Sequence, residues 1–202
     1  MANTLIAISF LSSALAYAAL ALMLRPSRYG QGAPRLRLRL AALATTVWAL
    51  VAWWVSGLPG LSAEVATLVD LSLVAVWLWQ LESFARWQSQ PRWLQSILRW
   101  AGGSTVLLAL LGLAPAFDAS LGALTARYLP FAGVLLSVLG LVTLEQLYRN
   151  ASSLSLPAIR WFVLGVGGIF TAELAGFADV VLLGGVAFEP WVARSVVVAL
   201  CA

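Results

Sequence analysis

Long apolar runs, separated by short polar or turn-forming segments, fill almost the whole chain. They predict helices near 3–24, 40–58, 62–85, 94–114, 122–147, 158–183 and 190–202. At about 1.5 Å per residue, the first six are each about long enough to cross a hydrocarbon core roughly 30 Å thick. The seventh is too short, so we expect it to be a truncated helix that continues past Ala202.

The composition indicates that lipid surrounds these runs. The chain is 62% hydrophobic and 10% charged, whereas soluble domains are roughly half apolar and a quarter charged. Lipid offers the backbone no hydrogen-bond partner, so a spanning segment must be a helix or belong to a closed barrel. Barrel strands alternate polar and apolar residues, but these runs are continuous. The sequence therefore predicts an all-α polytopic membrane protein, with one domain over 1–202 and about seven transmembrane helices.

Arginine is concentrated in alternate loops, between the first and second, third and fourth, and fifth and sixth predicted spans. The arginines on that side are Arg25, Arg28, Arg35, Arg37, Arg39, Arg86, Arg92, Arg99, Arg149 and Arg160. Short cytoplasmic loops carry the excess of positive charge, so we expect the N-terminus outside and the C-terminal end directed into the cytoplasm. The alternation of arginine and leucine over 35–39 suits a strand or an interfacial stretch beside anionic lipid. Lipid anchoring explains it, and no nucleic-acid partner is predicted.

Three residue types are scarce or missing, which excludes several chemistries. The chain has no lysine and no histidine, and Cys201 is its single cysteine. A retinal Schiff base needs lysine, histidine-ligated haem and zinc sites need histidine, and an internal disulfide needs a second cysteine. We predict no cofactor, no metal site and no catalytic residue.

Ionisable residues inside spans are the main candidates for function, because they are costly in lipid. Asp70 and Glu173 fall near mid-membrane, and Asp179 and Arg194 share a depth that predicts an ion pair. One interpretation is a polar pocket in the outer half that binds a ligand or senses protons. Its members are Asp70, Glu173, Asp179, Arg194 and Arg127. The other makes these residues ties between helices, which we favour for Asp179 with Arg194. For Asp70 and Glu173, whose burial would favour their neutral forms, both interpretations stay open.

Other local patterns predict ordinary helix packing. Glu82 and Glu145 each lie four residues before an arginine, Arg86 or Arg149, so they predict surface ion pairs. The glycines of 165–168 favour close approach of two helices.

Two tryptophans and one proline stand out within the predicted spans. Trp77 and Trp79 lie deep enough to line the bundle or a lipid-filled groove. Pro130 interrupts the fifth span, where it removes one helical hydrogen bond.

Four segments near the end of the chain carry a family resemblance. They are 145–150 (EQLYRN), Arg160–Trp161, 177–183 (FADVVLL) and 191–194 (WVAR). Together they resemble the N-terminal membrane region of the PrsK-type sensor histidine kinases, which accompany PEP-CTERM/exosortase sorting and exopolysaccharide systems of Gram-negative bacteria. The resemblance covers roughly 145–200. The family's acidic, proline-bearing loop after EQLYRN is replaced here by 151–157 (ASSLSLP).

The resemblance implies a sensory or anchoring input module in the bacterial inner membrane. It implies GAF-like and kinase modules downstream, a homodimer formed through the full-length kinase, and a cognate response regulator as partner. Membrane lipid is a further expected partner. This chain would not itself phosphorylate anything. A small transporter or channel that uses Asp70 and Glu173 is the alternative, and a purely structural anchor stays open. A membrane enzyme has the least support.

Overall fold

The fold is a bundle of helices. The computed structural model describes residues 2–24, 33–56, 63–88, 90–111, 119–151, 156–183 and 196–201. The helices of these ranges are α1 (Ala2–Met23), α2 (Ala33–Ser56), α3 (Ala63–Trp87), α4 (Arg92–Leu111), α5 (Ala119–Arg149) and α6 (Leu156–Leu183). A helical segment follows at 196–200, and none of the described residues is in a strand. The predicted all-α class is confirmed.

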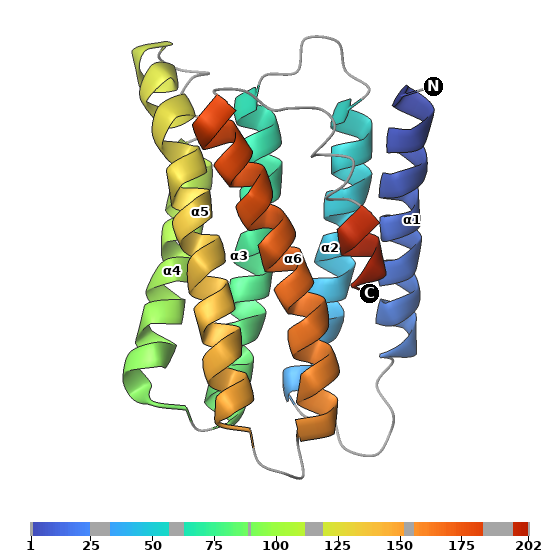
Figure 1. The fold of residues 1–202 in the computed structure, drawn as a ribbon, viewed down its shortest axis with the longest axis vertical. Coiled ribbons are helices and arrows are strands. Elements are labelled where there is room, and N and C mark those ends of the chain that lie inside the picture. Colours follow the sequence, from blue (N-terminus) through green and yellow to red (C-terminus); the bar gives the residue numbers. More distant parts are fainter. Residues whose placement is uncertain are drawn as a thin grey trace.

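The helices run roughly along one common axis and form two layers (Figure 1). The first layer holds α1, α2, α3 and α4, each packed against the next in chain order, and the second holds α5 and α6. Both α5 and α6 contact α3. The segment 196–200 lies beside α6, in front of α2 (Figure 1). Helix α3 is therefore the centre of the bundle.

Helix α3 is buried around most of its circumference. Its exposed residues recur every seven positions, at Ser72, Trp79 and Arg86, which is the spacing of a narrow stripe on one helix face. Asp70 precedes Ser72 by two residues, about 200° around the helix. The sequence of α3 therefore directs Asp70 into the bundle.

Several helices have the length and apolar character of membrane spans. Among the described residues the qualifying segments are Leu36–Val55, Thr67–Arg86, Arg127–Arg149 and Ile159–Leu183, and Ala7–Met23 is a shorter apolar helix. Helix α4 is not in this set and carries Arg92 and Arg99 within its 20 residues. The chain is thus a helical membrane protein. The total of seven spans and their direction stay predictions.

The predicted boundaries need one correction of substance, at the start of α2. The helix begins at Ala33 and includes residues 35–39, so the strand interpretation of that stretch is wrong. Leucine and arginine are both strong helix formers, and Pro34 lies in the first turn, where a missing N–H costs no helical bond. Helix α5 is also longer than expected and has Pro130 inside it.

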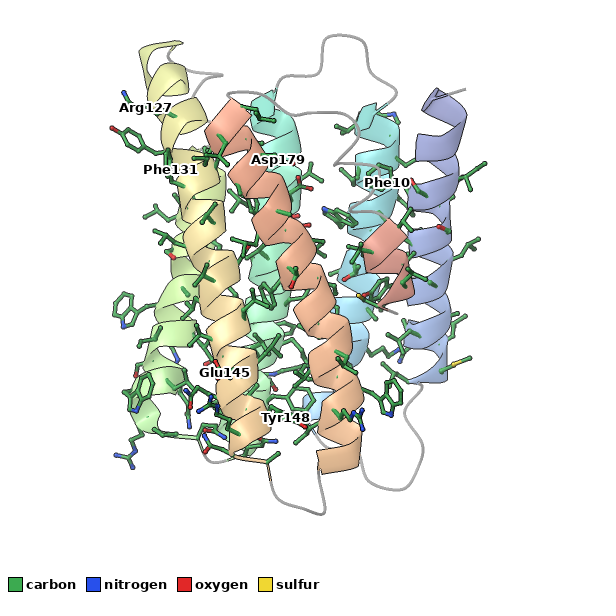
Figure 2. The ribbon with its side chains drawn as sticks, viewed as in Figure 1. Phe10, Arg127, Phe131, Glu145, Tyr148 and Asp179 are labelled. Carbon is green, nitrogen blue, oxygen red and sulfur yellow. The ribbon has the colours of Figure 1, made fainter. Side chains whose placement is uncertain are left out.

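The described arginines gather at one end of the bundle. That end joins the start of α2, the end of α3, the start of α4, the end of α5 and the start of α6. It holds Arg37, Arg39, Arg86, Arg92, Arg99, Arg149 and Arg160. Arg127 lies at the opposite end of α5 from Glu145 and Tyr148 (Figure 2). The charge asymmetry of the sequence is preserved in three dimensions.

Candidate functional site

Two acidic residues, Asp70 of α3 and Glu173 of α6, lie in the interior. Asp70 is 3% exposed and Glu173 is 0% exposed, and their two helices are in contact. Each takes part in a non-covalent interaction within the bundle, so neither is isolated. The sequence placed both residues near mid-membrane and left open whether they face inward. A buried carboxylate is costly, which makes these two residues the first candidates for a functional role.

Helix α6 turns one continuous face inward, and Glu173 belongs to it. Val166, Ile169, Phe170, Glu173 and Phe177 are all buried, at the three- and four-residue spacing of a helix stripe. Glu173 is thus flanked by a phenylalanine three residues before it and another four residues after it.

Both phenylalanine rings rest on glycines of α5. A Cβ built on Gly133 would lie 2.6 Å from ring carbons of Phe177, and one on Gly140 would lie 2.5 Å from Phe170. The absence of a side chain at these two positions lets α5 and α6 approach closely. The depth and rotation of Glu173 are therefore fixed by the packing of α6 on α5.

A second polar region lies among α1, α2 and α3, and the sequence analysis missed most of it. Tyr17, Trp48, Trp77 and Gln80 are each under 5% exposed. Tyr17 meets Trp77 edge-on at 6.2 Å between ring centroids, and Phe10 meets Trp48 in the same manner at 5.9 Å. Within the described ranges, the Tyr17 hydroxyl, both indole N–H groups and both polar atoms of Gln80 have no hydrogen-bond partner. The sequence signal for this buried polar region was the presence of Tyr17 and Gln80 inside apolar runs.

Two of the remaining predicted site residues, Asp179 and Arg127, lie near the opposite end from the arginine cluster. Asp179 is half-buried on α6, whereas Arg127 is exposed on α5, with its guanidinium 5.8 Å from the ring centre of Tyr128. Figure 2 shows Asp179 and Arg127 on different helices at that end. Arg194, and with it the predicted ion pair to Asp179, lies outside the described residues. The structure therefore brings Asp70 and Glu173 into the interior and leaves Arg127 on the surface.

Glu82 is the buried member of a cluster of three charged side chains. Its side chain is 9% exposed, and its two oxygens accept from Arg86 Nη2 at 3.2 Å and Arg99 Nε at 3.3 Å. The Glu82–Arg86 pairing is confirmed, but the predicted surface location is wrong for Glu82, because the packing of α4 on α3 buries its side chain. The contact with Arg99, on α4, was not foreseen. The Glu145–Arg149 pair is also confirmed, at 2.7 Å, with both side chains more than half exposed.

The EQLYRN segment, at the end of α5, contacts the turn between α3 and α4. Asn150 Nδ2 donates to Gln90 Oε1 at 3.0 Å, and Gln95 Nε2 donates to the Gln90 backbone oxygen at 2.8 Å. Leu147 of the same segment is 2% exposed. In this fold the segment therefore has a packing role that joins three helices.

Comparisons with protein-family models, curated proteins and solved structures give no match. In the described part of the chain, no group of three or more metal-binding side chains lies together. The function is therefore inferred from this chain's own residues and geometry.

Proposed function

We propose that this chain is the membrane-embedded sensory and anchoring input module of a bacterial sensor histidine kinase. It spans the inner membrane about seven times, with its N-terminus outside. It receives a signal from the cell envelope and passes it through its last helix to a cytoplasmic kinase. The resemblance over roughly 145–200 supports the kinase assignment.

One observation carries the proposed coupling. The segment at 196–201 packs on the glycines of α6, the helix that holds the buried Glu173. A Cβ on Gly168 would meet Cys201 Sγ at 2.5 Å, and one on Gly165 would meet the Cys201 backbone oxygen at 2.8 Å. Glu173 lies five residues beyond Gly168, about 7.5 Å along the helix axis. A shift of α6 around Glu173 would therefore move the segment 196–201.

The signal must favour one packing of the helices over another, because a ligand shifts an equilibrium only by its differential affinity for two states. Asp70 and Glu173 are the proposed residues at which the signal binds one packing state more tightly than the other. A proton or a ligand at either carboxylate would change the free energy of burying it.

Conservative changes at the two acids test this role. We expect Asp70→Asn and Glu173→Gln each to change signal-dependent autophosphorylation of the natural full-length protein by about fivefold or more. The matched controls are Ser72→Ala and Thr171→Ala, two residues away on the exposed faces of the same helices. Phosphate incorporation from ATP into native membranes, as acid-labile and base-stable label, is the measurement. If the full-length protein takes up no such phosphate, the kinase assignment is wrong. If the kinase is active and the two acid variants leave its output unchanged, as the controls do, the module is an anchor.

The proposed orientation has its own test on α5. Tyr128 and Tyr148 are both exposed and lie near opposite ends of the helix. In a Cys201→Ala background, we expect Tyr128→Cys to react with a membrane-impermeant maleimide in intact spheroplasts. Tyr148→Cys should react only after permeabilisation. The opposite pattern would invert the topology and place the kinase on the wrong side for ATP.

A transporter or channel is the second candidate, favoured by the buried polar residues Asp70, Gln80 and Glu173. The purified protein in liposomes would then move protons or a solute, and Asp70→Asn or Glu173→Gln would abolish the flux. Absence of flux for the unmodified protein, together with kinase activity, would separate the two functions.

A further inference from the structure

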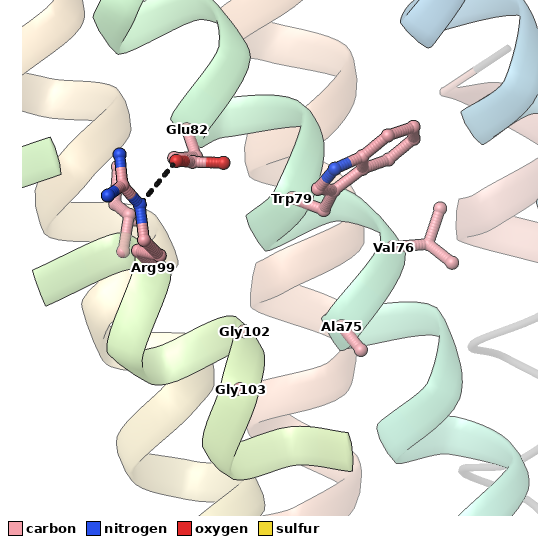
Figure 3. A pocket seen from close by; sticks show the side chains of 8 residues that line it. Ala75, Val76, Trp79, Glu82, Arg99, Gly102 and Gly103 are labelled. Carbon is pink, nitrogen blue, oxygen red and sulfur yellow. Dashed lines mark hydrogen bonds and ion pairs between the residues drawn. The ribbon is translucent and has the colours of Figure 1, made fainter. Parts of the chain in front are cut away.

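A groove of about 340 Å³ lies between α3 and α4, at the lower end of the size range of ligand sites (Figure 3). Trp79 and Val76 of α3 line it, with Gly102 and Gly103 of α4. Away from its charged end it is therefore lined by apolar side chains and bare backbone. Neither Asp70 nor Glu173 lines it.

The α4 side of the groove is left open by its two glycines. A Cβ built on Gly102 or Gly103 would meet no atom within 4 Å, whereas one on Gly133 would meet a phenylalanine ring at 2.6 Å. The glycines of α5 are thus filled by a neighbouring side chain, but those of α4 are not. Their surface is accessible to an apolar chain from outside.

The α3 side includes Trp79, and a third helix helps to position its indole ring. The Arg37 guanidinium of α2 lies 5.2 Å from the centre of the Trp79 ring, a cation–π distance. The residue Trp79 is 37% exposed, so part of its surface faces outward. An aromatic wall fixed in this way is already formed before any ligand arrives.

One end of the groove is positively charged. Glu82 lies there with Arg86 and Arg99, so the three side chains carry a net charge of +1. The Arg99 side chain is 68% exposed, and only its Nε is used in the pair with Glu82. Its two Nη groups have no hydrogen-bond acceptor among the described residues. They have the donor geometry that suits a phosphate.

We propose that this groove binds one anionic phospholipid. The phosphate lies on Arg99, and an acyl chain runs past Gly102 and Gly103 toward the middle of the bundle. Gly103 lies four residues beyond Arg99, about 6 Å deeper along α4. A cationic end joined to an apolar groove matches the two parts of a lipid, and basic pockets between transmembrane helices bind anionic headgroups.

Binding of defined lipids to the purified, delipidated protein tests the proposal. The probes are dioleoyl phosphatidylglycerol and dioleoyl phosphatidylcholine, and the bound number and Kd are read by native mass spectrometry. We expect one tightly bound phosphatidylglycerol, and we expect Arg99→Gln to weaken it by about fivefold, the effect of one basic side chain at a membrane surface. Gly103→Leu should weaken both lipids, because its side chain occupies the groove.

Two variants are matched controls. Ser104→Leu adds the same side chain one position away, and Arg160→Gln removes an exposed arginine from α6 at the same end of the bundle. Both should keep the affinity for phosphatidylglycerol, and all four variants should elute and melt as the unmodified protein does. Equal affinity for the two lipids would overturn recognition of the phosphate. Retention of phosphatidylglycerol by Gly103→Leu, or equal losses in a control, would show that the groove is not the site.

Discussion

Glu82→Arg is expected to destabilise the bundle by about 3–5 kcal/mol, the usual cost of leaving a buried charge uncompensated. The substitution places a third cation beside Arg86 and Arg99, at a position only 7% exposed. The two existing arginines are partly exposed and can turn toward water. Most of the loss in stability therefore comes from the buried arginine introduced at position 82. The contact between α3 and α4 should therefore open.

Glu145→Arg is the matched control for that change. Glu145 also precedes an arginine by four residues, at 2.7 Å from Arg149, but both side chains are more than half exposed. An exposed pair of this kind contributes at most about 0.5 kcal/mol. The free energy of unfolding, measured by circular dichroism as SDS is added to protein in mild detergent, gives both values. Equal losses in the two variants would contradict the buried position of Glu82.

The two ion pairs also show which parts of the fold were predictable from sequence. Hydrophobic runs and i,i+4 charges are local, so the all-helical class and the pairs Glu82–Arg86 and Glu145–Arg149 could be predicted from spacing, but the burial of Glu82 could not. Arg99 could not, because its contact with Glu82 joins residues 17 apart and depends on how α4 packs against α3. Local spacing does not fix that register.

The candidate site also has features that could be predicted from local sequence and features that could not. The position of Asp70 and Glu173 within apolar segments could be read from the sequence, and it marked them as candidates because ionisable groups are costly in lipid. Their burial against neighbouring helices depends on packing and could not. The contact of Tyr17 with Trp77 joins helices that are not consecutive in the chain, and no periodicity identifies such a pair. The helical state of 35–39 was not predicted, because alternation over five residues indicated a strand or an interfacial stretch beside anionic lipid.

Gly133→Ala and Gly140→Ala are each expected to destabilise the protein by about 1–3 kcal/mol, the cost of overpacking a tight interface. Each new methyl group would lie at 2.5–2.7 Å from carbons of a phenylalanine ring, so ring or helix must move. Gly102→Ala on α4 is the control. Its Cβ meets nothing within 4 Å, so it should be neutral or stabilise the helix by up to about 1 kcal/mol. SDS titration of the three variants provides the comparison.

A double-mutant cycle shows whether the ring is the cause. Phe170→Ala alone should cost about 3–5 kcal/mol through the cavity it leaves. Combined with Gly140→Ala, it should cost less than the sum, because the new methyl group has room once the ring is gone. Strict additivity would mean that the ring does not pack on Gly140. Since Phe170 and Phe177 flank Glu173 on α6, displacement of either ring also shifts the buried carboxylate. On the proposed sensory function, the glycine variants should therefore alter kinase output even where the fold survives.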